Sequence, residues 1–199
     1  RSTRLYDFLG VRYVLGSKEI VLDWNKFELA FDGDPAVNVY HNKTAMPRAI
    51  LVQRATFVAD QEEAWTRIHD AAFDPATSVV LEGSASEGIA GGEPAVGGKV
   101  SVRIYEPDRI EIAVDSPAGG YLVLSDPFYP GWRARLDGSP IEILRANYAF
   151  RAVPVPAGAH TVTMTFHPGS WYAGLSLSLA TLAALAVMAV ARSRHRNRQ

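Results

Sequence analysis

The chain has 199 residues, of which 48% are apolar and 21% charged, so it is long enough to bury a core and too apolar for wholesale disorder. It contains no cysteine, which excludes disulfides, thiolate metal sites and thiol catalysis. The formal net charge is -1, but arginines crowd the last eight residues, so the remainder is acidic and lacks the basic surface that nucleic-acid binding requires.

Residues 1–82 are expected to form an α+β portion. Helical spacing at 3–9 precedes four segments that are rich in β-branched, aromatic or other apolar residues. These segments predict strands at 11–16, 27–34, 37–42 and 48–59. Asp60 and Glu63 then have the spacing of a capping box, which predicts a helix from about Gln61 to Phe73.

The stretch 83–98 is rich in Gly, Ser, Ala and Pro and has no periodicity, which is typical of a linker. From 99 to 170 short alternating segments recur with a turn signal about every ten residues, which favours an antiparallel β-sandwich of seven strands. Asp137-Gly138 between two of these strands is a strong hairpin signal. The predicted strands are 99–106, 109–116, 121–126, 132–136, 141–144, 148–155 and 160–167.

Residues 171–191 form an uncharged run of 21, long enough for a transmembrane helix. Trp171 and Tyr172 stand at one end as interfacial aromatics, and the arginines of the tail 192–199 follow the other end. Since positive charge marks the cytoplasmic side, everything before Trp171 is expected to be extracytoplasmic and the tail cytoplasmic. The fold class is therefore mainly β with minor α, followed by one transmembrane helix.

The segment 128–138 combines aromatics with a Pro-Gly bend and offers two interpretations. In the first, which we favour, its aromatics close one end of the sandwich. In the second, flat aromatic rings beside charged side chains bind a glycan. The candidate glycan-binding residues are Tyr129, Trp132, Arg133, Asp137, Arg145 and Tyr148.

Catalytic and metal motifs are not evident in this sequence. The five histidines lack the spacing of metal ligands, and no serine has a recognisable nucleophile setting, so we predict no catalytic residue, metal or cofactor. Asn42-Lys43-Thr44 matches the N-glycosylation sequon, which matters only in a host that uses it.

Three stretches, LYDFLGVRYVL at 5–15, VYHNKTAMPRAILV at 39–52 and above all 128–178, resemble the C-terminal region of the YfhO family of bacterial multi-pass membrane proteins. The last stretch is the specific one. It contains, in order, the Tyr-Pro-Gly-Trp bend, the Asp-Gly hairpin, RANYAFRAV and PAGAHTV, and it leads directly into the apolar run.

The family is similar to GT-C membrane glycosyltransferases, which transfer sugars from polyprenyl-phosphate donors at the outer face of the membrane. This resemblance implies a catalytic carboxylate in an early outer loop, a region that this sequence does not contain. Because the chain starts at Arg1 without a methionine or signal segment, it is expected to be a fragment of a longer protein of the bacterial cell membrane.

The resemblance implies an accessory, noncatalytic outer domain of such an enzyme. The expected partners are upstream transmembrane helices, the lipid bilayer, a polyprenyl-phosphate sugar and an envelope glycan acceptor. Two alternatives remain open, namely a module that binds envelope glycan and a purely structural domain.

Overall fold

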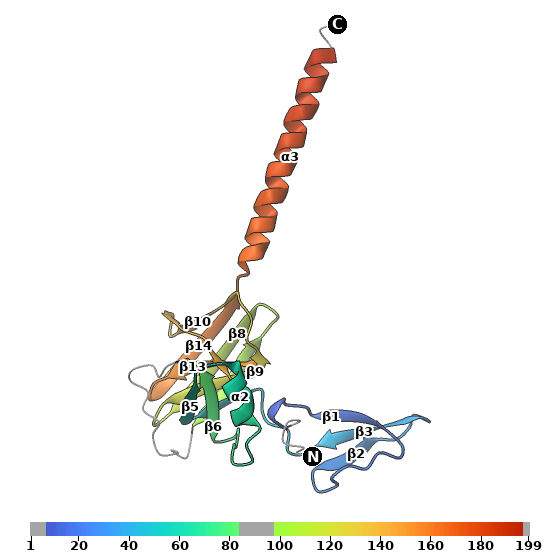
Figure 1. Cartoon of the computed structure of the whole chain (residues 1–199), viewed down its shortest axis with the longest axis vertical. Coiled ribbons are helices and arrows are strands. Elements are labelled where there is room, and N and C mark those ends of the chain that lie inside the picture. The colour runs from blue at the N-terminus through green and yellow to red at the C-terminus, as the bar shows by residue number, and fades with distance from the viewer. Residues whose placement is uncertain (1–6, 84–97, 197–199) are drawn as a thin grey trace.

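Three β-sheets, a short helix and a long C-terminal helix form the described part of the chain, residues 7–83 and 98–196 of this computed structural model (Figure 1). The prediction of a mainly β fold with one apolar C-terminal helix is confirmed. The helix expected at 3–9 lies mostly outside the described residues, although Asp7 and Phe8 are helical. The linker expected at 83–98 also lies almost wholly outside them.

An N-terminal sheet of three antiparallel strands stands to one side of the rest (Figure 1). Its order is β1-β3-β2, and Leu15 pairs with Val39, which in turn pairs with Phe31 across a bulge. Asp34 closes the β2–β3 turn, because its Oδ1 accepts hydrogen bonds from two backbone N–H groups. The strands are β1 (Tyr13–Ser17), β2 (Phe27–Phe31) and β3 (Val37–Asn42).

The six-stranded sheet joins both halves of the chain, in the order β4-β9-β13-β12-β6-β5. Its strand pairing thus crosses the boundary drawn from composition at 83–98. The strands are β4 (Ala49–Val52), β5 (Arg54–Val58), β6 (Ser78–Glu82), β9 (Gly120–Pro127), β12 (Leu144–Ala146) and β13 (Phe150–Val155).

The single strand predicted at 48–59 is wrong, because Gln53 divides it into β4 and β5. β4 pairs with β9, whereas β5 pairs in parallel with β6, so the two lie at opposite ends of the sheet order. Because only Gln53 separates these two edge strands in the chain, the six-stranded sheet must curve so that its two edges lie close together.

The connection between β5 and β6 contains α2 (Gln61–Ile68). The capping prediction is confirmed, because Asp60 Oδ1 accepts from Glu63 N at 2.9 Å. The helix is shorter than the predicted 61–73. It ends when Asp70 turns the chain, accepting a hydrogen bond from Ala72 N at 2.8 Å.

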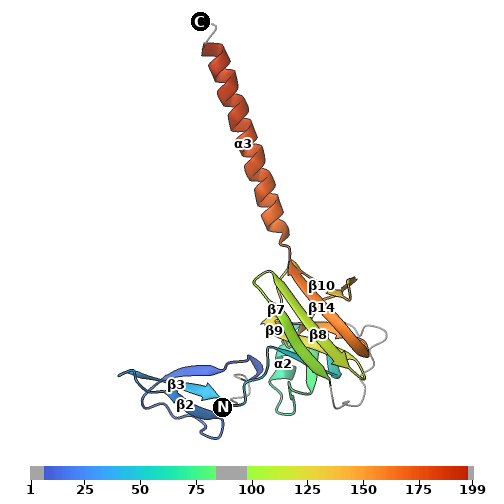
Figure 2. The same cartoon turned by 180° about the vertical axis from the view of Figure 1, so that it is seen from behind.

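The five-stranded sheet has the order β11-β10-β14-β8-β7, and Figure 2 shows β7, β8 and β14 side by side. The Asp137-Gly138 hairpin is confirmed, since both residues have the positive φ of a type I′ turn, 49° and 86°. The strands are β7 (Lys99–Tyr105), β8 (Arg109–Ser116), β10 (Trp132–Leu136), β11 (Ser139–Ile141) and β14 (Gly158–Phe166).

Residues 99–166 therefore supply eight strands rather than the predicted seven. The strand expected at 141–144 is wrong, because β11 ends at Ile141 and β12 begins at Leu144 in the other sheet. The chain therefore passes from the five-stranded to the six-stranded sheet between these residues.

Side-chain alternation along the central strands sends their apolar side chains into two clusters, and a third, smaller cluster of Val58, Ala64 and Val80 joins α2 to β5 and β6. Leu122 and Leu124 of β9 point between the sheets with Val153 and Val155 of β13. Their neighbours point into the curl of the six-stranded sheet instead. This second cluster includes Val52, Leu81, Tyr121, Val123 and Ala152. The central strands are thus buried on both faces, which explains their nearly continuous apolar sequences.

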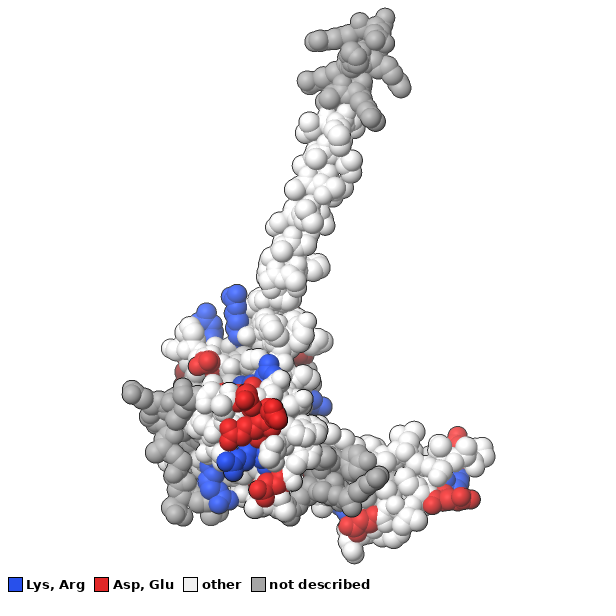
Figure 3. Space-filling model, in the orientation of Figure 1, with Lys and Arg blue, Asp and Glu red and all other residues white. Residues whose placement is uncertain are grey.

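The C-terminal helix α3 (Gly169–Arg196) follows β14 after only His167 and Pro168. Its apolar part, Gly169–Ala189, has 21 residues and a mean hydropathy of 1.8, and none of it is buried. It is long and apolar enough to span a membrane. Figure 3 shows that Lys, Arg, Asp and Glu gather over the body of the molecule and leave the visible length of this helix bare.

Candidate functional site

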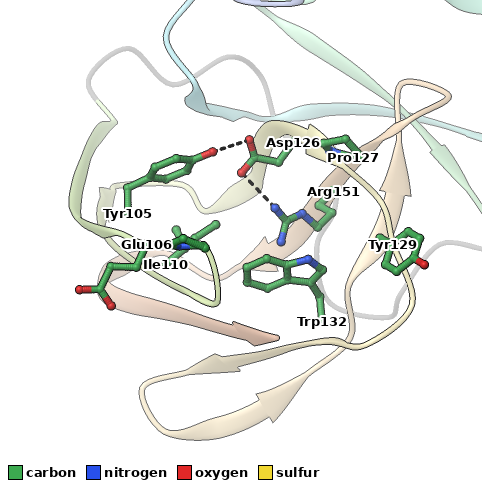
Figure 4. Close-up of a pocket in the computed structure, with 9 residues that line it drawn as sticks. Tyr105, Glu106, Ile110, Asp126, Pro127, Tyr129, Trp132 and Arg151 are labelled. Carbon is green, nitrogen blue, oxygen red and sulfur yellow. Dashed lines mark hydrogen bonds and ion pairs between the residues drawn. The ribbon is translucent and has the colours of Figure 1, made fainter. Parts of the chain in front are cut away.

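A hollow of about 520 Å³ opens at the end of the sandwich from which α3 leaves. Figure 4 shows the side chains that line it. Its place follows from the strand register, since Trp132 at the start of β10 pairs with Phe166 at the end of β14. Tyr105 and Tyr129 stand at opposite sides of it (Figure 4). The lining residues are Tyr105, Glu106, Pro107, Ile110, Asp126, Pro127, Tyr129, Trp132 and Arg151.

The floor of the hollow is an ion pair at positions that alternation makes inward-facing. Asp126 continues the face of Leu122 and Leu124, and Arg151 precedes Val153 on the same face of β13. Arg151 Nη2 donates to Asp126 Oδ2 at 3.0 Å, and the two side chains are only 3% and 7% exposed. The last layer of the core is therefore charged rather than apolar.

The other carboxylate oxygen of Asp126 accepts two further hydrogen bonds. Oδ1 accepts from Arg48 Nη1 at 2.7 Å and from the Tyr105 hydroxyl at 2.9 Å, so strands β7, β9 and β13 and the residue before β4 all meet here. The hydrogen bond to Asp126 raises the pKa of Arg48. Burial, aided by Asp126, raises the pKa of Tyr105 above its ordinary value, and the protonated hydroxyl donates to Asp126.

Arg151 is only partly satisfied by this network. Its Nε is buried without a hydrogen-bond partner among the described residues. Burial lowers the pKa of Arg151, and the charge of Asp126 opposes that effect. Breaking the pair would leave an uncompensated charge in the core.

Trp132 is held from two sides. The guanidinium carbon of Arg151 lies 4.0 Å from the centroid of the indole, and the ring of Phe166 lies at 5.4 Å. Because Arg151 covers a face that a sugar would need for stacking, the contacts of Trp132 are those of a structural residue. Tyr129, with 62% of its surface exposed, offers the freer ring.

The Tyr129-Pro130-Gly131 bend is fastened to the start of the membrane-length helix. His167 N donates to Gly131 O at 2.7 Å, and the ring of Tyr129 lies 6.2 Å from that of Phe166. Gly131 has φ +110°, and a Cβ there would come within 2.9 Å of the Phe166 ring and 3.1 Å of Pro168. Glycine is thus required both for its backbone conformation and for the close approach.

A second, smaller hollow of about 340 Å³ lies on the other side of Tyr129. Tyr129 and Trp132 line both hollows, and Arg133 lines only the second. The rest of its wall is apolar, with Phe128, Pro130, Ala134, Pro140, Ile141 and Ile143. Three of the six candidate glycan-binding residues are thereby brought together.

The other three candidates lie elsewhere and have partners of their own. Asp137, in the β10–β11 turn, pairs with His160 of the neighbouring strand β14 at 2.6 Å. Arg145 lies 3.7 Å from Glu82 and 4.8 Å from the centre of the Phe128 ring. Burial raises the pKa of Glu82, an effect that Arg145 opposes. Tyr148 packs against Trp65 of α2 at 5.0 Å.

The residues that sequence reasoning missed are Arg48, Tyr105, Asp126 and Arg151. One signal was available for the buried pair, since a charged residue that continues an inward-facing alternation is unusual. Arg48 and Tyr105 join the pair only through the fold, and nothing in the local pattern marks them.

The Asn42 sequon is not open to modification in the folded chain. Asn42 is 1% exposed, and its side-chain amide donates to Asp7 Oδ1 at 2.8 Å and to the carbonyl of Val11 at 2.9 Å. In the part of the chain that the structure describes, no group of three or more His, Asp or Glu could hold a metal ion.

Comparison with known proteins gives one match. Residues 98–178 match the family described as bacterial membrane protein YfhO, and the chain is consistent with the C-terminal region of a YfhO family protein. The resemblance seen in 128–178 is thereby confirmed, whereas the stretches 5–15 and 39–52 lie outside the matched residues. No curated protein and no solved structure matches the chain.

Proposed function

Proceeding from the match to the YfhO family, we propose that this chain is the extracytoplasmic accessory domain and last membrane helix of a polyprenyl-phosphate-sugar-dependent membrane glycosyltransferase. Sugar transfer takes place in another part of that protein. The observation that carries the proposal is the position of the larger hollow, which is built on the residues that join β14 to α3.

This position suits a sugar that is attached to a membrane lipid. If α3 spans the bilayer, the sugar of a polyprenyl-phosphate donor lies just outside the headgroup layer, where the hollow opens. Tyr129 offers an exposed ring, and Tyr105 and Trp132 add aromatic walls. Aromatic rings with a few fixed polar groups are what a carbohydrate site needs.

The charge distribution supports the outward orientation of the sandwich. Four arginines follow the apolar part of α3 within the last eight residues, and positive residues beside a membrane helix favour the cytoplasmic side. The residues before Gly169 would then lie outside the cell membrane.

A transfer assay tests the proposal. The whole YfhO family protein that carries this sequence is placed in proteoliposomes with polyprenyl-phosphate sugars, and Tyr129→Ala is compared with Tyr13→Ala, a matched control with 58% exposure in the N-terminal sheet. We expect Tyr129→Ala to raise the KM for the donor and Tyr13→Ala to leave it unchanged. Sugar transfer by residues 1–199 alone would overturn the assignment of catalysis to another region.

A second candidate is a module that binds an envelope glycan, and the exposed Tyr129 between two hollows favours it. Trp132 lines both hollows, so glycan binding should change tryptophan fluorescence. Titration of the chain with envelope polymers should give a saturable change that Tyr129→Ala weakens. The absence of saturation with every polymer would leave a structural role for this end of the sandwich.

A further inference from the structure

The length of α3 fixes where the bilayer begins. Its apolar part, Gly169–Ala189, has 21 residues and rises about 32 Å, against a hydrocarbon core of about 30 Å. Gly169 therefore lies at the edge of the hydrocarbon. Groups within roughly 5–8 Å of it on the sandwich side fall in the headgroup layer, which has about that thickness in each leaflet.

The sandwich cannot stand far from this boundary. Only His167 and Pro168 separate β14 from α3, and the chain stays hydrogen-bonded to the sandwich as far as His167. Phe166 N donates to Asp108 O at 2.8 Å, and His167 N donates to Gly131 O at 2.7 Å. The end of the sandwich must therefore reach the membrane surface together with the helix.

The end face of the sandwich, which we define as Tyr129, Pro130, Arg133, Trp171 and Tyr172, has the composition of a membrane interface. Its three aromatic rings are 62%, 64% and 53% exposed, although Trp and Tyr bury much of their surface in ordinary folds. Trp and Tyr are the residues that prefer the interface between membrane and water. Tyr129 comes from a bend about forty residues before the helix, so the fold, and not the helix sequence, places it there.

Charges of both signs surround the end face. Glu106 and Asp108 of the β7–β8 turn are exposed nearby, and Arg133 and Arg109 flank Thr165 on neighbouring strands. Arg109 is engaged by Glu111 at 3.2 Å. Arg133 has no hydrogen bond or ion pair with any side chain that the structure describes. Net charge therefore does not attract the end face to the membrane, but the guanidinium of Arg133 is available to bind a lipid phosphate.

We propose that the end face is a bilayer-docking surface, in which the Tyr129 ring lies in the headgroup layer and Arg133 contacts a lipid phosphate. The occupant is the lipid surface because α3 brings it there. Docking holds the mouth of the larger hollow just outside the lipid headgroups. The proposal depends on α3 spanning the bilayer and not on the sugar chemistry proposed above.

Because the chain has no cysteine, single cysteines can carry a fluorophore without background labelling. Asp108→Cys places the reporter beside the end face, and Ala159→Cys places a control near the other end of β14, about 23 Å away along the strand. Both variants of the full chain are put in nanodiscs whose lipids carry a nitroxide in the headgroup, and iodide serves as an aqueous quencher.

We expect the nitroxide lipids to quench the reporter at 108 and not the one at 159. Tyr129→Ser should abolish much of this quenching, Tyr129→Trp should retain it, and Tyr13→Ser should leave it unchanged. Arg133→Gln should weaken it less than Tyr129→Ser. Thermal unfolding of each variant shows that a lost signal does not come from a lost fold.

Two results would overturn the proposal. Quenching of both reporters by iodide alone would mean that the end face stands off the bilayer. Protection of position 108 from both quenchers would mean that protein, such as a second copy of the chain, covers the end face. Neither result would bear on sugar transfer, so this proposal and the proposed function can fail separately.

Discussion

Two carboxylates, one in the sandwich and one beside the N-terminal sheet, each accept hydrogen bonds from three side chains. Comparing their surroundings shows what stabilises each of these two regions. Asp126 in the sandwich accepts from Arg48, Tyr105 and Arg151. Asp7, beside the N-terminal sheet, accepts from Lys26, Asn42 and Thr44. The two networks look alike, but their surroundings differ.

The Asp126 network is one layer of an already apolar core. Ile110, Leu124, Val153 and Met164 lie in the same interior and are at most 2% exposed. The N-terminal sheet has no comparable cluster among its described residues, and its large apolar side chains are mostly exposed. Examples are Tyr13, Leu15, Leu29 and Phe31, each more than 50% exposed. In this sheet the polar network takes the place of a core.

The largest expected effect is at Asp126. Asp126→Ala leaves the buried Arg151 charge unpaired, and breaking a buried ion pair in this way costs about 3–5 kcal/mol. Urea unfolding of the chain in nanodiscs, followed by circular dichroism, measures the loss. Asp115→Ala, an exposed acid on β8, is the control.

The double variant Asp126→Leu, Arg151→Met should recover most of this stability, because it replaces the pair with apolar groups of similar size. If Asp126→Ala costs no more than Asp115→Ala, the ion pair is not buried in solution.

A matched pair of leucines sharpens the contrast between the regions. Leu122 is 0% exposed between the two sheets, and Leu15 is 68% exposed on the N-terminal sheet. Leu122→Ala should lower the free energy of unfolding by about 2–5 kcal/mol, whereas Leu15→Ala should change it by about 0.5 kcal/mol or less. Equal costs would indicate that the apolar face of the N-terminal sheet is covered in solution.

The sequence was most informative where one strand face is buried and turns bound the strand. β8 and β10 were predicted to the residue, because alternation and turn signals agree there. The break between two strands at Gln53 and the passage from one sheet to the other at residues 142–143 were not predicted. Both depend on which strand, distant in the sequence, the next segment pairs with. Local pattern contains no information on that choice.

The candidate site was predictable in part for the same reason. The bend at 129–131 has a local signature, so Tyr129, Trp132 and Arg133 could be singled out together. Asp137, Arg145 and Tyr148 are near these residues in the sequence, but the hairpin and the crossing to β12 carry them to other partners. Asp126 and Arg151 meet only when β9 and β13 pair, which no local pattern predicts.

A smaller, local effect is expected at Asp7. Asp7→Ala removes the acceptor for three donors and should destabilise the N-terminal sheet by about 1–3 kcal/mol. Hydrogen exchange should then accelerate in the amides of β3 while those of β8 keep their protection. Asp32→Ala, an exposed acid in the β2–β3 turn, should change neither. Faster exchange throughout β8 would show that the two regions unfold as one unit, against the contrast drawn above.

The smallest effect concerns a pair that lies within the sandwich but outside its core. His160 Nδ1 lies 2.6 Å from Asp137 Oδ2, which raises the pKa of His160, while the same contact lowers the pKa of Asp137. Because the folded chain holds the His160 proton more tightly than the unfolded chain, this pair stabilises fully between the ordinary aspartate pKa of about 3.9 and the ordinary histidine pKa of about 6.5. The stabilisation is lost as the pH rises through the raised value.

Comparing Tm at pH 6 and pH 9 for the native chain and for His160→Gln isolates this contribution, since other titrations cancel in the difference. We expect the variant to lose stability at pH 6 and little at pH 9. His41→Gln is the control, because its pairing with Glu28 at 2.9 Å lies in the N-terminal sheet. An equal loss at both pH values would mean that His160 acts through packing alone. Packing, and not ion pairing, would then stabilise the sandwich even at its exposed hairpin. The N-terminal sheet, which a polar network stabilises, would differ from the sandwich in this respect throughout.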